Sequence, residues 1–158
     1  MTLITERIEI AIEPWLWQFA ITNRAAIDRY FAELQRQRPA IWNGRVLLLK
    51  RYRIHDGVFC GTCFETDYAS FIAWRDWRFP DASVHNIFAV AALQAADGAY
   101  LVGEMGPHTA SANKLYFPCG TPEPLDTDDR QHLNLQENLR RELLEETGLD
   151  IEELEAKP

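Results

Sequence analysis

The stretch LNLQENLRRELLEET, residues 133–147, constrains the fold more than any other part of the chain because it carries a strong helical pattern. Leucines recur at every fourth position, which places them on one face of an α-helix. These leucines are Leu135, Leu139 and Leu143. Asn134 suits the N-cap, with Glu137 at capping-box spacing, and Gly148 suits the left-handed residue that ends a helix. We therefore expect an amphipathic helix that packs its apolar face against a sheet.

The end of this helix gathers negative charge in a way that local physics disfavours. Glu142 lies three residues before Glu145 and four before Glu146, so the three carboxylates share one helix face. Like charges at this spacing repel each other, and a helix C-terminus favours cations. A hard divalent cation such as Mg²⁺ would stabilise the cluster, since it takes oxygen ligands and keeps waters for substrate phosphates. The alternative is a solvated acidic face.

The nine residues from Arg141 to Leu149, RELLEETGL, resemble the second half of the Nudix box, whose pattern is G-x5-E-x7-R-E-U-x-E-E-x-G-U, with U apolar. The resemblance implies an α/β protein, a Nudix-like α/β/α sandwich with a mixed sheet. It also implies a hydrolase that cleaves nucleoside diphosphates linked to another moiety. Glu142, Glu145 and Glu146 would bind Mg²⁺ or Mn²⁺, and Arg141 would hold a structural or catalytic carboxylate in place.

The first half of the box departs from the family pattern. Counting back from Arg141 puts the glutamate and the glycine of the pattern at positions where the chain has Leu133 and Thr127. A glycine ends an earlier strand in FPCGTPEP, where Gly120 and Glu123 resemble the opening of the box. An insertion of about seven residues within DTDDRQH would reconcile the two halves.

The missing glutamate leaves the partner of Arg141 open. Glu137, four residues before Arg141, or Glu123, reaching from the loop, could replace it. By the resemblance, Gly120 would supply a backbone carbonyl group to the metal.

Short pieces of the chain also resemble one branch of the family, the hydrolases of UDP-glucose and UDP-galactose. That branch carries a Gly-x-Pro-Glu-Pro loop, an expanded box and an Asn-Gly turn ahead of it. GTPEP, DTDDRQH and WNGRVLLLKRYR are the matching pieces here. The likeness implies a nucleoside diphosphate derivative, a nucleotide sugar, as the substrate.

The patterns divide the chain into an N-terminal α+β region, residues 1–85, and a Nudix-like domain, residues 86–158. In the first region, alternation predicts a strand within residues 6–17, and an apolar stripe predicts a helix over residues 24–37 capped by Thr22 or Asn23. A hairpin is expected around Asp56-Gly57. A helix capped at Thr66 or Asp67 should follow and end by Pro80.

In the second region, a hairpin of residues 85–95 and 99–105 is expected around Asp97-Gly98, followed by a short strand that enters the Gly/Pro loop. Family members continue well past the box with more strands, a second helix and often a general base. Only DIEELEAKP follows here. We therefore expect the C-terminal part of the fold to be missing, and dimerisation or the first 85 residues to cover the exposed sheet.

Three other groups of residues could have functions. Cys60 and Cys63 form a C-x2-C pair, which is typical of buried structural cysteines, of zinc or of redox chemistry. Among five tryptophans, which would mostly serve the core, Trp42 beside the Asn-Gly turn is the candidate for stacking on a nucleobase. Arg51 and Arg53 share one strand face and would suit a diphosphate, or would protect an exposed edge strand.

The charge balance excludes several function classes. The chain has a formal net charge of -8 and a sequence pI of about 5.0, which disfavours binding to nucleic acids or anionic membranes. No apolar run approaches the roughly 18 residues of a membrane span. The N-terminus lacks a secretory signal, and three cysteines argue against a disulfide scaffold. We expect a cytoplasmic protein.

The leading hypothesis is a Mg²⁺-dependent Nudix pyrophosphohydrolase that acts on a nucleoside diphosphate linked to another moiety. The altered first half of the box and the short tail favour an alternative, a non-catalytic Nudix-like module that binds a nucleotide. A third interpretation is a structural domain whose acidic helix only keeps it soluble.

Overall fold

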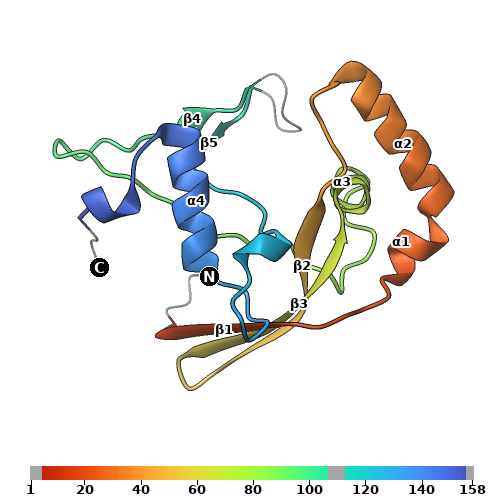
Figure 1. Ribbon diagram of the computed structural model, residues 1–158, viewed down its shortest axis with the longest axis horizontal. Helices are drawn as coiled ribbons and strands as arrows, with labels where there is room; N and C mark the ends of the chain where they lie inside the picture. Colours follow the sequence, from red (N-terminus) through yellow and green to blue (C-terminus); the bar gives the residue numbers. More distant parts are fainter. Residues whose placement is uncertain (1–4, 107–112, 156–158) are drawn as a thin grey trace.

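The computed structural model describes residues 5–106 and 113–155, and its centre is a three-stranded mixed sheet (Figure 1). The strands are β1 (Arg7–Ile12), β2 (Arg45–His55) and β3 (Val58–Asp67), in the order β1-β3-β2. β2 and β3 pair antiparallel through the predicted hairpin, and β1 pairs parallel to β3. Asp56 and Gly57 form the hairpin turn with φ of 49° and 73°, a conformation that glycine adopts without strain. The expected first strand and hairpin are confirmed.

Three helices belong to the N-terminal half: α1 (Gln18–Thr22), α2 (Arg24–Gln37) and α3 (Tyr68–Asp76). The bounds of α2 agree with the prediction. Its N-cap position is Asn23, but the Asn23 side chain donates to the Phe19 carbonyl oxygen at 2.8 Å and caps nothing in α2. The expected side-chain cap of α2 is therefore wrong. Asp67 caps α3 as predicted, accepting a hydrogen bond from the Ser70 amide at 3.0 Å.

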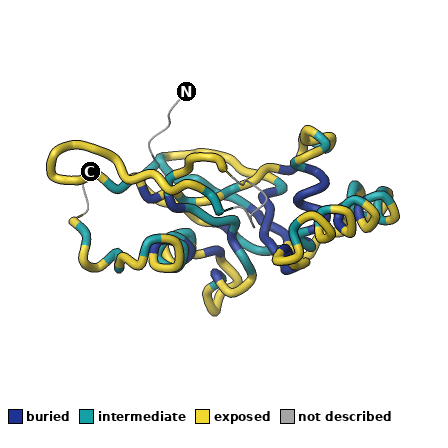
Figure 2. Tube along the Cα trace, turned by 90° about the horizontal axis from the view of Figure 1, so that it is seen from above, coloured by how far each residue is buried: buried dark blue, intermediate teal, exposed yellow. Residues whose placement is uncertain are grey.

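The two faces of β2 pack against different parts of the chain because its side chains alternate. Val46 and Leu48 face the helices in a core that also contains Phe64, Phe71 and Trp74. The opposite face meets residues that lie far away in the sequence. Leu47 and Leu49 of this face pack with Ile10 of β1, Cys63 of β3 and Leu133, and Ile87 and Leu135 pack against this cluster. Figure 2 shows the buried segments gathered in the middle of the molecule, with exposed chain around them.

The second predicted hairpin does not form a regular pair of strands, so this prediction is wrong. Of the residues predicted for it, only Gly103–Glu104 forms a ladder in the described part of the chain, as β4 paired with β5 (Leu115–Tyr116), and residues 85–102 contribute isolated bridges such as Gln94 with Tyr100. The turn at Gly98 is present, with φ of 91°. Val90, Tyr100, Leu101 and Val102 are all exposed, so their side chains do not pack as the apolar face of a regular sheet would. The short strand before the Gly/Pro loop is confirmed as β5.

The predicted amphipathic helix is present as α4 (Leu135–Thr147), preceded by the 3-10 turn η1 (Pro124–Asp126) and followed by η2 (Ile151–Glu153). Asn134 caps it by accepting a hydrogen bond from the Glu137 amide at 3.0 Å. Gly148 ends it in the left-handed conformation, with φ of 73°. Both predicted ends of this helix are therefore confirmed.

The polar insertion before α4 joins the two halves of the chain. The Ile12 amide of β1 donates to the Gln131 carbonyl oxygen at 2.9 Å, and the Leu133 amide donates to the Ile10 carbonyl oxygen at 2.8 Å. An antiparallel bridge between Ala11 and His132 lies between these bonds. The insertion thus extends the sheet beside β1 and fixes where α4 begins.

The protein is therefore a mixed α/β protein with a mixed sheet and, within the described ranges, four α-helices. In the same ranges, no helix combines the length and the apolar character that crossing a membrane requires.

The contacts of Asp67 generate a first prediction. Its carboxylate caps α3, accepts the Ser70 hydroxyl at 2.8 Å and pairs with Arg24 of α2 at 3.0 Å, so Asp67→Ala should lower the free energy of unfolding by about 1–2 kcal/mol. Asp28→Ala is the matched control, since Asp28 pairs with Arg24 in an exposed position and should cost less than about 1 kcal/mol. Urea denaturation measures both values. Equal losses in the two variants would contradict the capping role.

Candidate functional site

The acidic end of α4 lies directly against the Gly/Pro loop. A side chain at residue 120 would overlap the carboxylate of Glu142 in its present position, so glycine lets this carboxylate lie directly against the loop backbone. One turn further along α4, Glu146 accepts a hydrogen bond from the Cys119 amide at 3.2 Å. Loop and helix end are therefore joined at two successive residues, which brings the Gly120 backbone beside the helix carboxylates.

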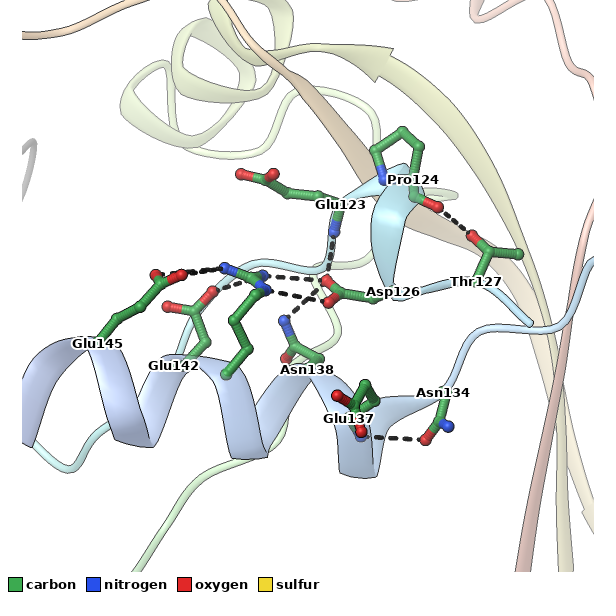
Figure 3. A network of polar contacts seen from close by, with 10 residues as sticks. Glu123, Pro124, Asp126, Thr127, Asn134, Glu137, Asn138, Glu142 and Glu145 are labelled. Atoms are coloured by element: carbon green, nitrogen blue, oxygen red, sulfur yellow. Dashed lines mark hydrogen bonds and ion pairs between the residues drawn. The ribbon is translucent and has the colours of Figure 1, made fainter. Parts of the chain in front are cut away.

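A buried ion pair between Arg141 and Asp126 holds this arrangement. The Asp126 side chain is fully buried and accepts from Arg141 Nε at 3.3 Å and Nη2 at 3.2 Å. It also accepts from Asn138 Nδ2 at 3.0 Å and from the Glu123 amide at 2.9 Å. Figure 3 shows Asp126 facing the helix, with Glu142 and Glu145 on the same side of α4. One carboxylate thus fixes both the loop and the helix.

Asp126 corrects the expected partner of Arg141, which was Glu137 or Glu123. Glu137 belongs to the first turn of α4, and its carboxylate lies 4.0 Å from Arg140. Glu123 is the N-cap residue of η1, and its backbone amide donates to Asp126. Asp126 follows Gly120 by six residues, the spacing between glycine and glutamate in the pattern quoted above. Placing the insertion after Asp126, with aspartate in the position of the glutamate, would have found this residue from the sequence.

Arg141 also organises the two carboxylates that follow it. Its Nη2 lies 2.8 Å from Glu142, and its Nη1 lies 3.3 Å from Glu145. With these contacts the guanidinium faces three carboxylates, since it also pairs with Asp126. The arginine therefore fixes the positions of Glu142 and Glu145 relative to the loop.

The crowded carboxylates hold protons more tightly than isolated ones. Burial raises the pKa of Glu142 to about 7 against the opposing effect of Arg141, and the neighbouring acids add to the increase. Burial also raises the pKa of Glu146 and of Glu123. A bound cation would replace these protons and relieve the repulsion.

The residues present fit a hard divalent cation by their chemistry, since all of them offer oxygen donors. As they stand, no three acidic, histidine or cysteine side chains in residues 5–106 and 113–155 converge on one point that could hold a metal. Glu142 and Glu145 are turned towards Arg141, and Glu146 towards the Cys119 amide. Binding a metal would therefore require rotations of these side chains about α4.

A cavity of about 490 Å³ extends from the acidic residues to the N-terminal half of the chain. Glu123, Glu142 and Glu146 contribute one part of its lining, together with Gly120. Met105, Tyr116, Cys119 and Thr121 also line it, and residues of the first ninety contribute the rest. Those that bear on function are Trp42, Gly44, Arg45, Arg75, Asn86 and Phe88. Trp42, which the sequence suggested for a nucleobase, is therefore part of the same cavity as the carboxylates.

Arg51 and Arg53 are not among the residues that line this cavity, so the expectation that they meet a diphosphate here has no geometric support. Arg51 Nη2 donates to Glu13 at 2.9 Å, and Glu13 also pairs with Lys50. Both arginines lie on β2 towards the hairpin turn. The cationic side chains that do line the cavity are those of Arg45 and Arg75.

Cys63 of the C-x2-C pair matches the expected buried structural cysteine, whereas Cys60 is only partly buried. Cys63 is buried in the core, and burial raises the pKa of its thiol to about 12. Cys60, Cys63 and Cys119 are all free thiols. A protonated, buried thiol is a poor metal ligand and a poor nucleophile.

Comparison with known proteins finds no protein-family model and no curated protein that matches this chain. The likeness to the Nudix box therefore stays a prediction, which depends on the motif and on the geometry just described.

The buried pair supplies the second prediction. Asp126→Asn removes the charge that faces Arg141 and should lower the free energy of unfolding by about 2 kcal/mol, the scale of a hydrogen bond to a charged group. Glu137→Gln, at the alternative partner, should change it by less than about 0.5 kcal/mol. Chemical denaturation measures both. A larger loss for Glu137→Gln than for Asp126→Asn would refute the pairing.

The third prediction concerns pH. Because the pKa of Glu142 is about 7 in the folded chain and 4.5 for the unperturbed group, the folded state binds more protons between these values. Glu142 therefore lowers the free energy of unfolding as pH rises through this window. Glu142→Gln should be more stable than the wild type at pH 8 in EDTA, and the difference should shrink towards pH 4.5. Parallel stability curves for the two proteins would contradict this prediction.

Proposed function

We propose that the chain is a Mg²⁺-dependent Nudix-type hydrolase that cleaves a diphosphate bridge. The observation that carries the proposal is the pair of Arg141 with Asp126, which sets Glu142 against Gly120 at the edge of a ligand-sized cavity. A solvated acidic face would need neither a buried aspartate partner nor a glycine at the point of contact. The specific sandwich fold of the family is part of this proposal.

Four groups would hold the metal: the Gly120 carbonyl oxygen and the carboxylates of Glu142, Glu145 and Glu146. Bound there, Mg²⁺ or Mn²⁺ supplies neutralisation of the diphosphate and a lowered pKa of an attacking water. Arg141 keeps Glu142 and Glu145 oriented through the contacts described above. Glu123 lines the same cavity, and burial raises its pKa, so it is the carboxylate best suited to accept a proton from the water.

The substrate that fits the proposal is a nucleoside diphosphate derivative, with a nucleotide sugar as the first choice. The GTPEP loop, which resembles the UDP-sugar branch of the family, contains both Gly120 and Glu123. The volume of the cavity is within the range of small-molecule sites, about 300–1,000 Å³.

One observation favours a second function, a nucleotide-binding module without catalysis. The helix carboxylates are directed towards Arg141 and the Cys119 amide instead of a common point. If the metal cannot reorient them, ligands would bind without turnover. Product formation at saturating Mg²⁺ distinguishes the two functions.

The fourth prediction is that Mg²⁺ raises the melting temperature and supports turnover of the substrate. Both effects should depend on the carboxylates of Glu145 and Glu146. Millimolar Mg²⁺ should raise Tm, and UDP-glucose or ADP-ribose should raise it further, since a ligand at 100 times its Kd adds about 2.7 kcal/mol. Glu145→Gln and Glu146→Gln should each lower turnover at least tenfold and remove the Mg²⁺ shift while the variants stay folded. Glu137→Gln, in the first turn of the same helix and beside Arg140, should behave like the wild type.

Two results would overturn the proposal. The first is an equal Mg²⁺ shift in Glu146→Gln and in the wild type. The second is loss of folding, instead of loss of activity, in both glutamine variants.

A further inference from the structure

Three exposed aromatic side chains line the cavity that contains the acidic residues. They are Trp42, Phe88 and Tyr116, with exposed fractions of 72%, 45% and 40%. They come from three segments far apart in the sequence. None of them makes a ring contact with another aromatic residue in the described part of the chain, whereas most other rings of the protein do. The exposed parts of these three rings therefore offer apolar surface to the cavity.

Trp42 is held in place although it is exposed. An ideal Cβ at residue 44 would lie 2.9 Å from Trp42 Cζ2, so the indole lies against the Gly44 backbone. Gly44 is buried, and its carbonyl oxygen accepts a hydrogen bond from the Tyr68 amide at 2.9 Å. Asn43 Oδ1 accepts one from the Ala69 amide at 2.8 Å. The turn that carries Trp42 is thus fixed to the start of α3.

A fixed, exposed indole is well suited to stack on a planar ring. Stacking on an aromatic side chain contributes about 1–3 kcal/mol per base, and a ring that is already in place loses little entropy when the ligand binds. Asn86 lines the same cavity and offers both a donor and an acceptor, as the edge of a heterocycle requires. Three rings around one cavity favour a planar ligand over a purely polar one.

We infer that Trp42, positioned by Gly44, is the stacking wall that selects a ligand with a planar heterocycle at the end away from the carboxylates. The inference rests on the proposed function for the diphosphate end of that ligand. Trp42 of the N-terminal half then selects the heterocycle, and the acidic helix supplies the residues that handle the phosphates. Trp42 acts directly on the ligand, and Gly44 is a positioning residue.

The test is isothermal titration calorimetry in Mg²⁺ with three probes: UDP, inorganic pyrophosphate and glucose 1-phosphate. UDP should bind the wild type more tightly than pyrophosphate does. Trp42→Ala should weaken UDP at least fivefold and leave pyrophosphate unchanged. Trp42→Phe should restore most of the affinity because it keeps a ring.

Two further variants separate stacking from folding. Gly44→Ala should weaken UDP to an intermediate degree, because the new methyl group displaces the indole while φ at residue 44 allows alanine. Leu16→Ala removes an exposed apolar side chain, 82% accessible, that does not line this cavity, and should bind UDP like the wild type. Equal weakening of UDP and pyrophosphate in Trp42→Ala would overturn the inference. A Trp42→Ala variant that loses affinity for glucose 1-phosphate alone would also overturn the inference, because the indole would then contact a sugar.

The same titrations separate this inference from the proposed function. If pyrophosphate binds in a Mg²⁺- and Glu146-dependent manner but UDP binds no tighter, the proposed function stands and the stacking wall is wrong. If UDP binding needs Trp42 but neither Mg²⁺ nor Glu146, the stacking wall stands and the metal-dependent function is wrong. If none of the probes binds the wild type, both are wrong.

Discussion

The buried pair of Asp126 and Arg141 is the interaction on which the rest of the site depends. A carboxylate without exposure must be compensated, and here a guanidinium, an amide side chain and a backbone amide all donate to it. The same guanidinium then orients the carboxylates of the next helical turn. A single charged pair therefore sets the geometry of the loop, the helix and the acidic face together.

The cavity shows why neither half of the chain would make this site alone. The acidic residues come from the Gly/Pro loop and α4, whereas the aromatic residue with the greatest exposure, Trp42, comes from the turn before β2. The sheet has one face on the N-terminal helices and the other on Leu133 and Leu135 at the start of α4. Packing across this second face fixes the position of the two parts of the cavity relative to each other.

The local patterns predicted most of the regular structure. The bounds of α2 and both ends of α4 follow from apolar periodicity, an N-cap asparagine and a C-terminal glycine, all of which act over a few residues. The hairpin around Gly98 was predicted wrongly. A regular ladder is stable only when its apolar face packs on another part of the protein, and the sequence does not reveal whether such packing occurs. Asp126 was missed for a related reason, since its role depends on where an insertion is placed. Arg51 is paired with Glu13, a contact across 38 residues that no local pattern contains.

The hydrogen bonds between the insertion and β1 have a consequence for how the molecule behaves in concentrated solution. A three-stranded sheet has two free edges, and an unpaired edge invites strands of other molecules and leads to aggregation. Residues 131–133 occupy the edge at β1, and His85 and Pro122 meet β2 at the opposite edge. Proline lacks an amide hydrogen, so it cannot donate a hydrogen bond to a further strand. Segments before and within the candidate site therefore cover part of each edge of the N-terminal sheet and limit edge-to-edge association there.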